Sequence, residues 1–175
     1  SLPSPFAFDP PYRPYPHGYS WHYSERLEVE GENGVINPHV IANTYQFCDH
    51  AQENRILYGE LAALLDCMKR RANQRKVEDP EEQEKLFWRT LDDGTRMELP
   101  EIDVTKYEYQ FPAEKHFPVL LLSYVRPKHA RILYACMGGP QITIRQSKLY
   151  SFETRAIAPV NLFARYLLST ALMTD

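Results

Sequence analysis

The sequence predicts an α+β fold, in which an antiparallel β-meander packs against a long amphipathic helix, a second short helix and an apolar C-terminal helix. Apolar residues recur every three or four positions over residues 44–76, and strand-like runs separated by turns fill residues 119–152. The resulting order of helix, helix, strands, helix is typical of helices gathered against an antiparallel sheet. With 175 residues, 43% of them hydrophobic, we expect one α+β domain over residues 25–175, preceded by an extended arm over residues 1–24.

The arm is rich in proline and in aromatic residues. Residues 1–23 hold six of the 14 prolines, and because proline fixes φ and lacks an N–H donor, this segment is expected to be extended. Aromatic side chains bury large areas, so the arm should dock, either on its own domain, on a partner or on a second copy of the chain. The predicted partner-contact residues are Phe6, Phe8, Tyr12, Tyr15, Tyr19 and Trp21.

A turn and a helix are predicted next. Asn33 and Gly34 form a turn signal for a hairpin between residues 27–30 and 35–36. The spacing of apolar residues over residues 44–76 predicts the long amphipathic helix. Its basic tail, residues 69–76, suits the negative end of the helix dipole, and nucleic-acid contact is the alternative for that cluster.

The second helix has clear start signals. Asp79 is placed as the N-cap, Pro80 as the first helical residue and Glu82 as the closing residue of a capping box, with a stop near residues 92–94. Alternation of aromatic and polar residues then predicts a half-buried strand over residues 106–111.

Four further strands and a last helix complete the prediction. The continuous apolar run at residues 119–122 indicates a strand covered on both faces. The predicted strands are residues 119–125, 130–137, 142–146 and 149–152, and the predicted apolar helix is residues 159–173.

Charge is distributed unevenly along the chain. The net charge is −3, yet residues 115–152 carry six Lys or Arg and no Asp or Glu. These cations either flank the sheet and pair with acidic side chains of the helices, or bind the phosphates of a nucleic acid. The candidate nucleic-acid residues are Arg126, Lys128, His129, Arg131, Arg145 and Lys148.

Cysteine and histidine spacing predicts neither disulfides nor a metal site. Cys48, Cys67 and Cys136 are odd in number and far apart, which favours a reducing intracellular compartment, cytoplasmic or nuclear. Cys48 and His50 form the closest Cys/His pair, but on a helix their side chains would point about 200° apart. The N-terminus shows no signal-peptide pattern and no run is long enough to cross a bilayer. We expect no cofactor, no small-molecule substrate and no membrane contact.

A metal-dependent nuclease would need carboxylates that converge on a cation. The element order over residues 50–172 resembles the restriction-endonuclease-like core, but residues 117–152 lack carboxylates, and Asp103 with Glu108 lacks the lysine of that family's motif. The resemblance therefore implies at most a degenerate relative without metal chemistry. A catalytic reading requires four acids to meet: Glu53, Glu60, Asp103 and Glu108.

These patterns lead to two hypotheses from different classes. The first is a non-enzymatic protein-interaction domain, which uses the arm and the apolar C-terminal helix to contact a protein partner or a second copy. The alternative is a nucleic-acid-binding module that uses the basic region over residues 115–148.

Overall fold

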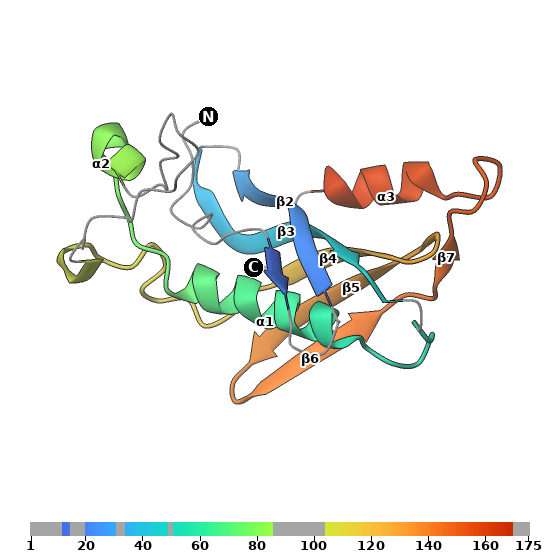
Figure 1. Ribbon diagram of the computed structural model, residues 1–175. Helices are drawn as coiled ribbons and strands as arrows, with labels where there is room; N and C mark the ends of the chain where they lie inside the picture. The colour runs from blue at the N-terminus through green and yellow to red at the C-terminus, as the bar shows by residue number, and fades with distance from the viewer. Residues whose placement is uncertain (1–11, 15–19, 31–33, 49–50, 86–103, 170–175) are drawn as a thin grey trace.

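The computed structural model describes residues 12–14, 20–30, 34–48, 51–85 and 104–169. These residues form a seven-stranded sheet with helix α1 on one side and helix α3 on the other (Figure 1). The strands are β1 (Tyr12–Pro14), β2 (Ser20–Glu30), β3 (Ile36–Gln46), β4 (Val119–Val125), β5 (His129–Gly138), β6 (Gln141–Gln146) and β7 (Tyr150–Ser151). The helices are α1 (Tyr58–Ala72), α2 (Pro80–Lys85) and α3 (Val160–Leu167). No helix within these residues is long and apolar enough to cross a membrane.

The sheet is mixed rather than wholly antiparallel. Its strand order is β1-β2-β3-β4-β5-β6, and β7 pairs with β5 beside β6. All pairings are antiparallel except β3 with β4, which run parallel from Val40↔Val119 to Gln46↔Val125. Parallel neighbours need a long crossover connection, and α1 lies within the segment that joins them. The α+β class therefore stands, and the predicted meander corresponds to β4, β5 and β6.

The predicted hairpin is present, but its strands are longer than expected. β2 and β3 pair from Trp21↔Gln46 to Glu30↔Ile36, and Gly34 adopts a φ of 71°, which favours glycine. β2 crosses the expected boundary between the arm and the domain at residues 24 and 25.

The long helix was predicted to begin too early. Residues 44–46 belong to β3, and α1 begins at Tyr58 and spans 15 residues. Local capping explains the start, because the Glu60 carboxylate accepts a hydrogen bond from the Leu57 N–H at 2.8 Å. The last turn carries the expected cations, and Arg71 is fully buried, with its guanidinium 2.6 Å from the Glu28 carboxylate of β2.

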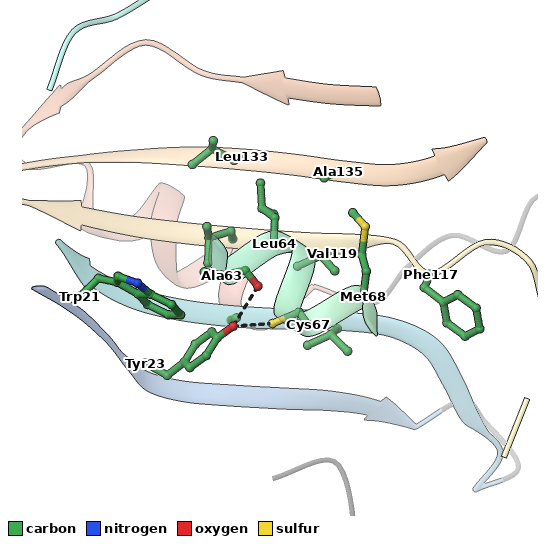
Figure 2. Packing of buried hydrophobic residues seen from close by; sticks show 13 residues of the cluster. Trp21, Tyr23, Ala63, Leu64, Cys67, Met68, Phe117, Val119, Leu133 and Ala135 are labelled. Carbon is green, nitrogen blue, oxygen red and sulfur yellow. Dashed lines mark hydrogen bonds between the residues drawn. The ribbon is translucent and has the colours of Figure 1, made fainter. Parts of the chain in front are cut away.

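Helix α1 builds the larger core cluster on one face of the sheet. Figure 2 shows Leu64 and Met68 directed at Leu133 and Val119 of the sheet. On the same helix, the carbonyl of Ala63 accepts a hydrogen bond of 2.8 Å from the Tyr23 hydroxyl of β2. The buried members are Trp21, Tyr23, Val40, Ala42, Ala63, Leu64, Cys67, Met68, Phe117, Val119, Leu121, Leu133 and Ala135.

Helix α3 covers the opposite face with a smaller cluster. Phe163 is 3% exposed and packs with Leu122, Ala130 and Ile132. The helix has eight residues, whereas residues 159–173 were predicted; the last of these lie outside the described range.

Residues 106–111 do not form the predicted strand. Val104–Lys106 is a 3-10 helix, and the following residues contribute a single bridge, Arg75↔Tyr109. The alternation of tyrosines was misleading, because Tyr109 is exposed and stacks its ring 3.8 Å from the Arg75 guanidinium.

The second helix begins as predicted, and the later strands match closely. Asp79 accepts a hydrogen bond from the Glu81 N–H at 3.0 Å, and α2 starts at Pro80. Glu82 accepts a hydrogen bond from the Tyr107 hydroxyl at 3.1 Å. The predicted end of this helix lies in residues 86–103, outside the described residues. β4 has the predicted bounds, and β5, β6 and β7 begin or end within one residue of prediction.

Candidate functional site

An open pocket of about 230 Å³ lies where β3 and β4 end. Because these strands run parallel, their carboxyl ends meet at the same edge of the sheet. In open α/β sheets, ligands bind in crevices outside the carboxyl ends of the parallel strands, and β3 with β4 is the parallel pair among the described strands. The pocket is lined by Tyr45, Gln46, Phe47, Tyr124, Val125, Arg126, Pro127, Lys128, His129 and Phe152.

A row of aromatic rings crosses the sheet beside this pocket. Tyr45 is the register partner of His22 on β2 and of Tyr124 on β4. The centre of its ring lies 5.2 Å from that of His22 and 5.3 Å from that of Tyr124, and the interplanar angle is 26° in both cases. Since side chains alternate along a strand, this row faces away from α1. Tyr45 keeps 44% of its surface exposed, so the row is accessible from solvent.

Cations line the rim of the pocket. Arg126 and Lys128 are exposed in the turn between β4 and β5, and His129 is half-buried. The Arg126 guanidinium lies 4.7 Å from the centre of the Phe47 ring, within cation–π distance. Backbone bonds hold the turn, because Arg126 donates its N–H to the carbonyl of Gln46 at 3.4 Å. Among the residues that the structure describes, none of those lining the pocket carries a carboxylate.

The environment of Tyr124 favours the neutral form of its phenol. Burial raises the pKa of the Tyr124 phenol, and Tyr45 and the Glu25 carboxylate raise it further. That carboxylate accepts a hydrogen bond from the Asn43 amide at 2.8 Å. Tyr124 is therefore a neutral hydrogen-bond donor at physiological pH.

The first turn of α1 presses against one wall of the pocket. Gln46 is 4% exposed and donates a hydrogen bond to the Thr44 hydroxyl at 3.2 Å. A Cβ atom on Gly59 would stand 2.2 Å from the Gln46 Oε1 atom and 2.8 Å from the Trp21 ring. Glycine is required at this close approach, which fixes the helix against the strand ends.

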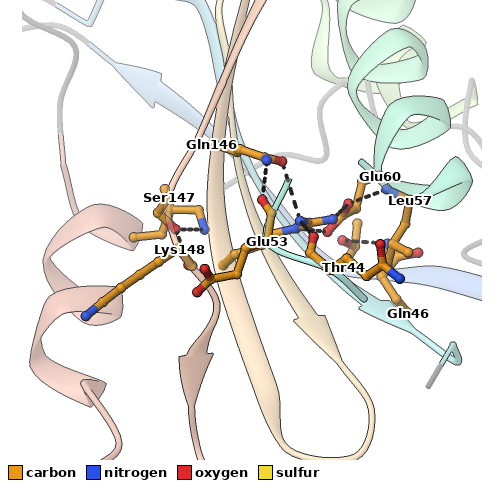
Figure 3. A network of polar contacts seen from close by, with 11 residues as sticks. Thr44, Gln46, Glu53, Leu57, Glu60, Gln146, Ser147 and Lys148 are labelled. Atoms are coloured by element: carbon orange, nitrogen blue, oxygen red, sulfur yellow. Dashed lines mark hydrogen bonds and ion pairs between the residues drawn. The ribbon is translucent and has the colours of Figure 1, made fainter. Parts of the chain in front are cut away.

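Arg131, a candidate nucleic-acid residue, lies in the protein interior. Its side chain and that of Glu60 are both 0% exposed and form a two-pronged ion pair, in which the Arg131 Nε atom donates to Glu60 at 2.8 Å. The backbone carbonyl of Gln52 accepts a further bond at 2.9 Å. Figure 3 shows this network reaching Gln146 on β6. Arg131 therefore ties β5 to α1. This agrees with the expectation that the cations of residues 115–152 pair with acidic side chains of the helices. Its side chain is not available to a nucleic acid.

The structure brings three of the six candidate nucleic-acid residues together. Arg126, Lys128 and His129 line the pocket, whereas Arg145 pairs opposite Tyr134, five residues along β5 from His129. At about 3.4 Å per residue, this places Arg145 about 17 Å away along the strand. Lys148 is exposed and its ammonium lies 5.4 Å from the Tyr150 ring.

The predicted partner-contact residues of the arm are only partly described. Phe6, Phe8, Tyr15 and Tyr19 lie outside the described residues. Tyr12 belongs to β1, which pairs with β2 of the same chain. Trp21 is 7% exposed and lies in the core, so its side chain stabilises the chain's own fold and is not free to contact a partner.

The acids of the catalytic reading do not meet in the described structure. Glu60 is committed to Arg131, while Glu53 and Glu108 are exposed, and Asp103 lies outside the described residues. Across the described ranges, no group of three or more His, Cys, Asp or Glu side chains is placed to hold a metal ion.

The aromatic residues of the pocket were missed by sequence reasoning. Tyr45 and Phe47 alternate around Gln46, which is the strand period, but residues 44–47 were assigned to the helix.

Comparison of the chain with protein-family models, curated proteins and solved structures gave no match.

Proposed function

We propose that this chain is a non-enzymatic nucleic-acid-binding module, with its contact surface at the carboxyl ends of β3 and β4. The observation that carries the proposal is the grouping of Arg126, Lys128 and His129 with aromatic rings, of which Tyr45 is 44% exposed, in a pocket whose described lining residues include no carboxylate. Cations that track phosphates, combined with rings that accept bases, are the usual elements of single-strand recognition.

Electrostatics around the pocket favour a polyanion, even though the chain is acidic overall. The net charge is −3, but charges farther away than a Debye length, about 10 Å at 0.1 M salt, are largely screened. Arg126 and Lys128 are exposed and can touch a phosphate directly. Direct contacts of these two cations with phosphates should therefore outweigh the repulsion between the nucleic acid and the distant acidic residues.

The salt dependence of binding tests this proposal quantitatively. Two phosphates neutralised by Arg126 and Lys128 give a slope of about −1.4 for log affinity of a single strand against log salt. Raising the salt from about 50 to about 200 mM should then weaken binding about 7-fold. Fluorescence anisotropy with labelled short DNA and RNA strands measures both quantities.

Charge-matched variants locate the surface. Arg126→Ala with Lys128→Ala should abolish binding at physiological salt and flatten the salt slope. Arg145→Ala with Lys148→Ala removes the same charge from exposed positions outside the pocket and serves as the control. Equal effects of the two pairs, or no binding at the lower salt, would overturn the proposal.

A second candidate function is protein interaction, and the surface of α3 favours it. Leu168 is 79% exposed, and Val160 and Ile157 are each more than half exposed. We propose this apolar surface as the contact for a protein partner or for a second copy of the chain. Val160→Ser with Leu168→Ser should lower the association measured by sedimentation velocity, whereas Asn161→Ser should not. Association that persists unchanged in the double variant would remove this candidate.

A further inference from the structure

We propose that the pocket holds one unstacked base of a single-stranded nucleic acid, while Arg126 and Lys128 bind the phosphates on either side of it. This inference rests on the proposed function and deepens it, because it names the ligand as a single strand rather than a duplex. Three features of the pocket support it: its size, the chemistry of its walls and the position of its cations.

The size of the pocket suits a single planar ring. Its volume of about 230 Å³ lies below the range of about 300–1,000 Å³ typical of sites for whole drug-sized molecules. A larger ligand can therefore insert only one unit of its length. In a duplex every base is paired and stacked, so a base must be extruded at a free-energy cost before it enters such a pocket. A single strand pays much less of that cost.

The walls offer ring contacts and few groups that read base identity. Tyr45 lies near the end of β3, Phe47 follows that strand, and Phe152 also lines the pocket. Tyr45 stands between His22 and Tyr124 with its ring stacked on both, so a base meets the edges of these rings, and apolar contact of this kind does not distinguish one base from another. Gln46, the amide in the lining, is 4% exposed and already bonded to Thr44. We therefore expect a preference for single strands with little discrimination among bases.

The cations stand on the rim rather than at the bottom. Arg126 and Lys128 are separated by one residue in an exposed turn, and the Lys128 carbonyl accepts the Phe152 N–H at 2.7 Å, which ties the turn to another lining residue. A base that enters between the walls would leave its flanking phosphates beside these two side chains. The Arg126 guanidinium lies over the Phe47 ring, so Phe47 positions this cation at the pocket and a base would contact only the edge of its ring.

The experiment compares three short ligands of equal length in the same salt: a single strand with its bases, the same strand with abasic sites throughout, and a blunt duplex. The first two carry identical phosphates, so their difference isolates the bases. We expect the abasic strand and the duplex to bind about 10-fold more weakly than the complete strand. Phe47→Ala should remove this difference, whereas Tyr166→Ala, which truncates an exposed ring on α3, should leave it intact.

A crosslinking measurement avoids dependence on the folding of variants. A strand that carries one photoreactive 5-iodouracil should crosslink to the wild-type chain at Tyr45, Phe47, Tyr124 or Phe152, as mapped by mass spectrometry. Crosslinks confined to other surfaces would overturn the inference.

The possible failures are distinguishable. If the abasic and complete strands bind equally and still require Arg126 and Lys128, the chain binds phosphates alone, and the inference fails while the proposed function stands. If no strand binds, both fail. If a Phe-containing peptide displaces the strand while the bases make no difference, the pocket belongs to a protein side chain, which also overturns the inference.

Discussion

Replacing Glu60 by glutamine should strongly destabilise the protein, because it leaves a buried cation without its counter-charge. Arg131 and Glu60 are both 0% exposed, and after Glu60→Gln the remaining acceptors around the guanidinium are neutral: the Gln52 carbonyl at 2.9 Å and the Gln146 amide at 3.4 Å. Breaking a buried pair by removing one partner costs about 3–5 kcal/mol. Glutamine keeps an acceptor oxygen near Arg131, so we expect the lower end, about 3 kcal/mol.

Urea unfolding followed by circular dichroism measures this loss. With a slope of about 2 kcal/mol per M, a loss of about 3 kcal/mol lowers the midpoint by about 1.5 M. Glu153→Gln is the control, since Glu153 is exposed and its substitution should change stability by no more than about 0.5 kcal/mol. Combining Glu60→Gln with Arg131→Met should restore part of the loss, because the unpaired cation is removed as well. A loss below about 1 kcal/mol for Glu60→Gln, at an unchanged slope, would refute the reasoning.

Two further predictions concern packing and protonation. Gly59→Ala should lower stability by about 1–3 kcal/mol in thermal unfolding, because its Cβ would overlap Gln46 and Trp21. Alanine is the better helix former by about 1 kcal/mol, and this gain is smaller than the free-energy cost of the overlap. Gly138→Ala, where a Cβ meets nothing within 4 Å, should be nearly neutral, and equal effects would contradict the steric argument. Burial lowers the pKa of the His39 imidazole, so the unfolded chain binds this proton first, and the free energy of unfolding should fall as pH drops below about 6.5. His39→Gln should reduce that pH dependence in urea titrations, and an unchanged dependence would exclude His39 as its source.

The parts of the fold that could be predicted are those held by neighbouring residues. β4 was predicted at its observed bounds, because a continuous apolar run between turn residues has few other structures open to it. The parallel pairing of β3 with β4 could not be predicted, since it joins segments separated by about 70 residues and depends on how α1 packs. Residues 44–57 were assigned to the helix because the spacing of Phe47 and Ala51 mimics a helical turn by coincidence.

The candidate site shows the same division. The turn cations were visible in the sequence, and Arg126 and Lys128 do reach the surface. The position of Arg131 could have been inferred from strand alternation, because it shares a face of β5 with Leu133, which is fully buried. The aromatic wall could not be found in this way, since Tyr45 and Tyr124 are far apart in sequence and meet only through the parallel register.

The parallel register of β3 and β4 also has a kinetic consequence. It joins two locally connected halves, the β2–β3 hairpin and the β4–β6 meander, and contacts between such distant segments form slowly because a long loop must close first. Helix α1 spans the join, with Arg71 paired to Glu28 in one half and Glu60 paired to Arg131 in the other. The pocket draws Tyr45 from the first half and Tyr124 from the second. Each half can therefore acquire its own structure early in folding, while the pocket is complete only after the two halves have docked.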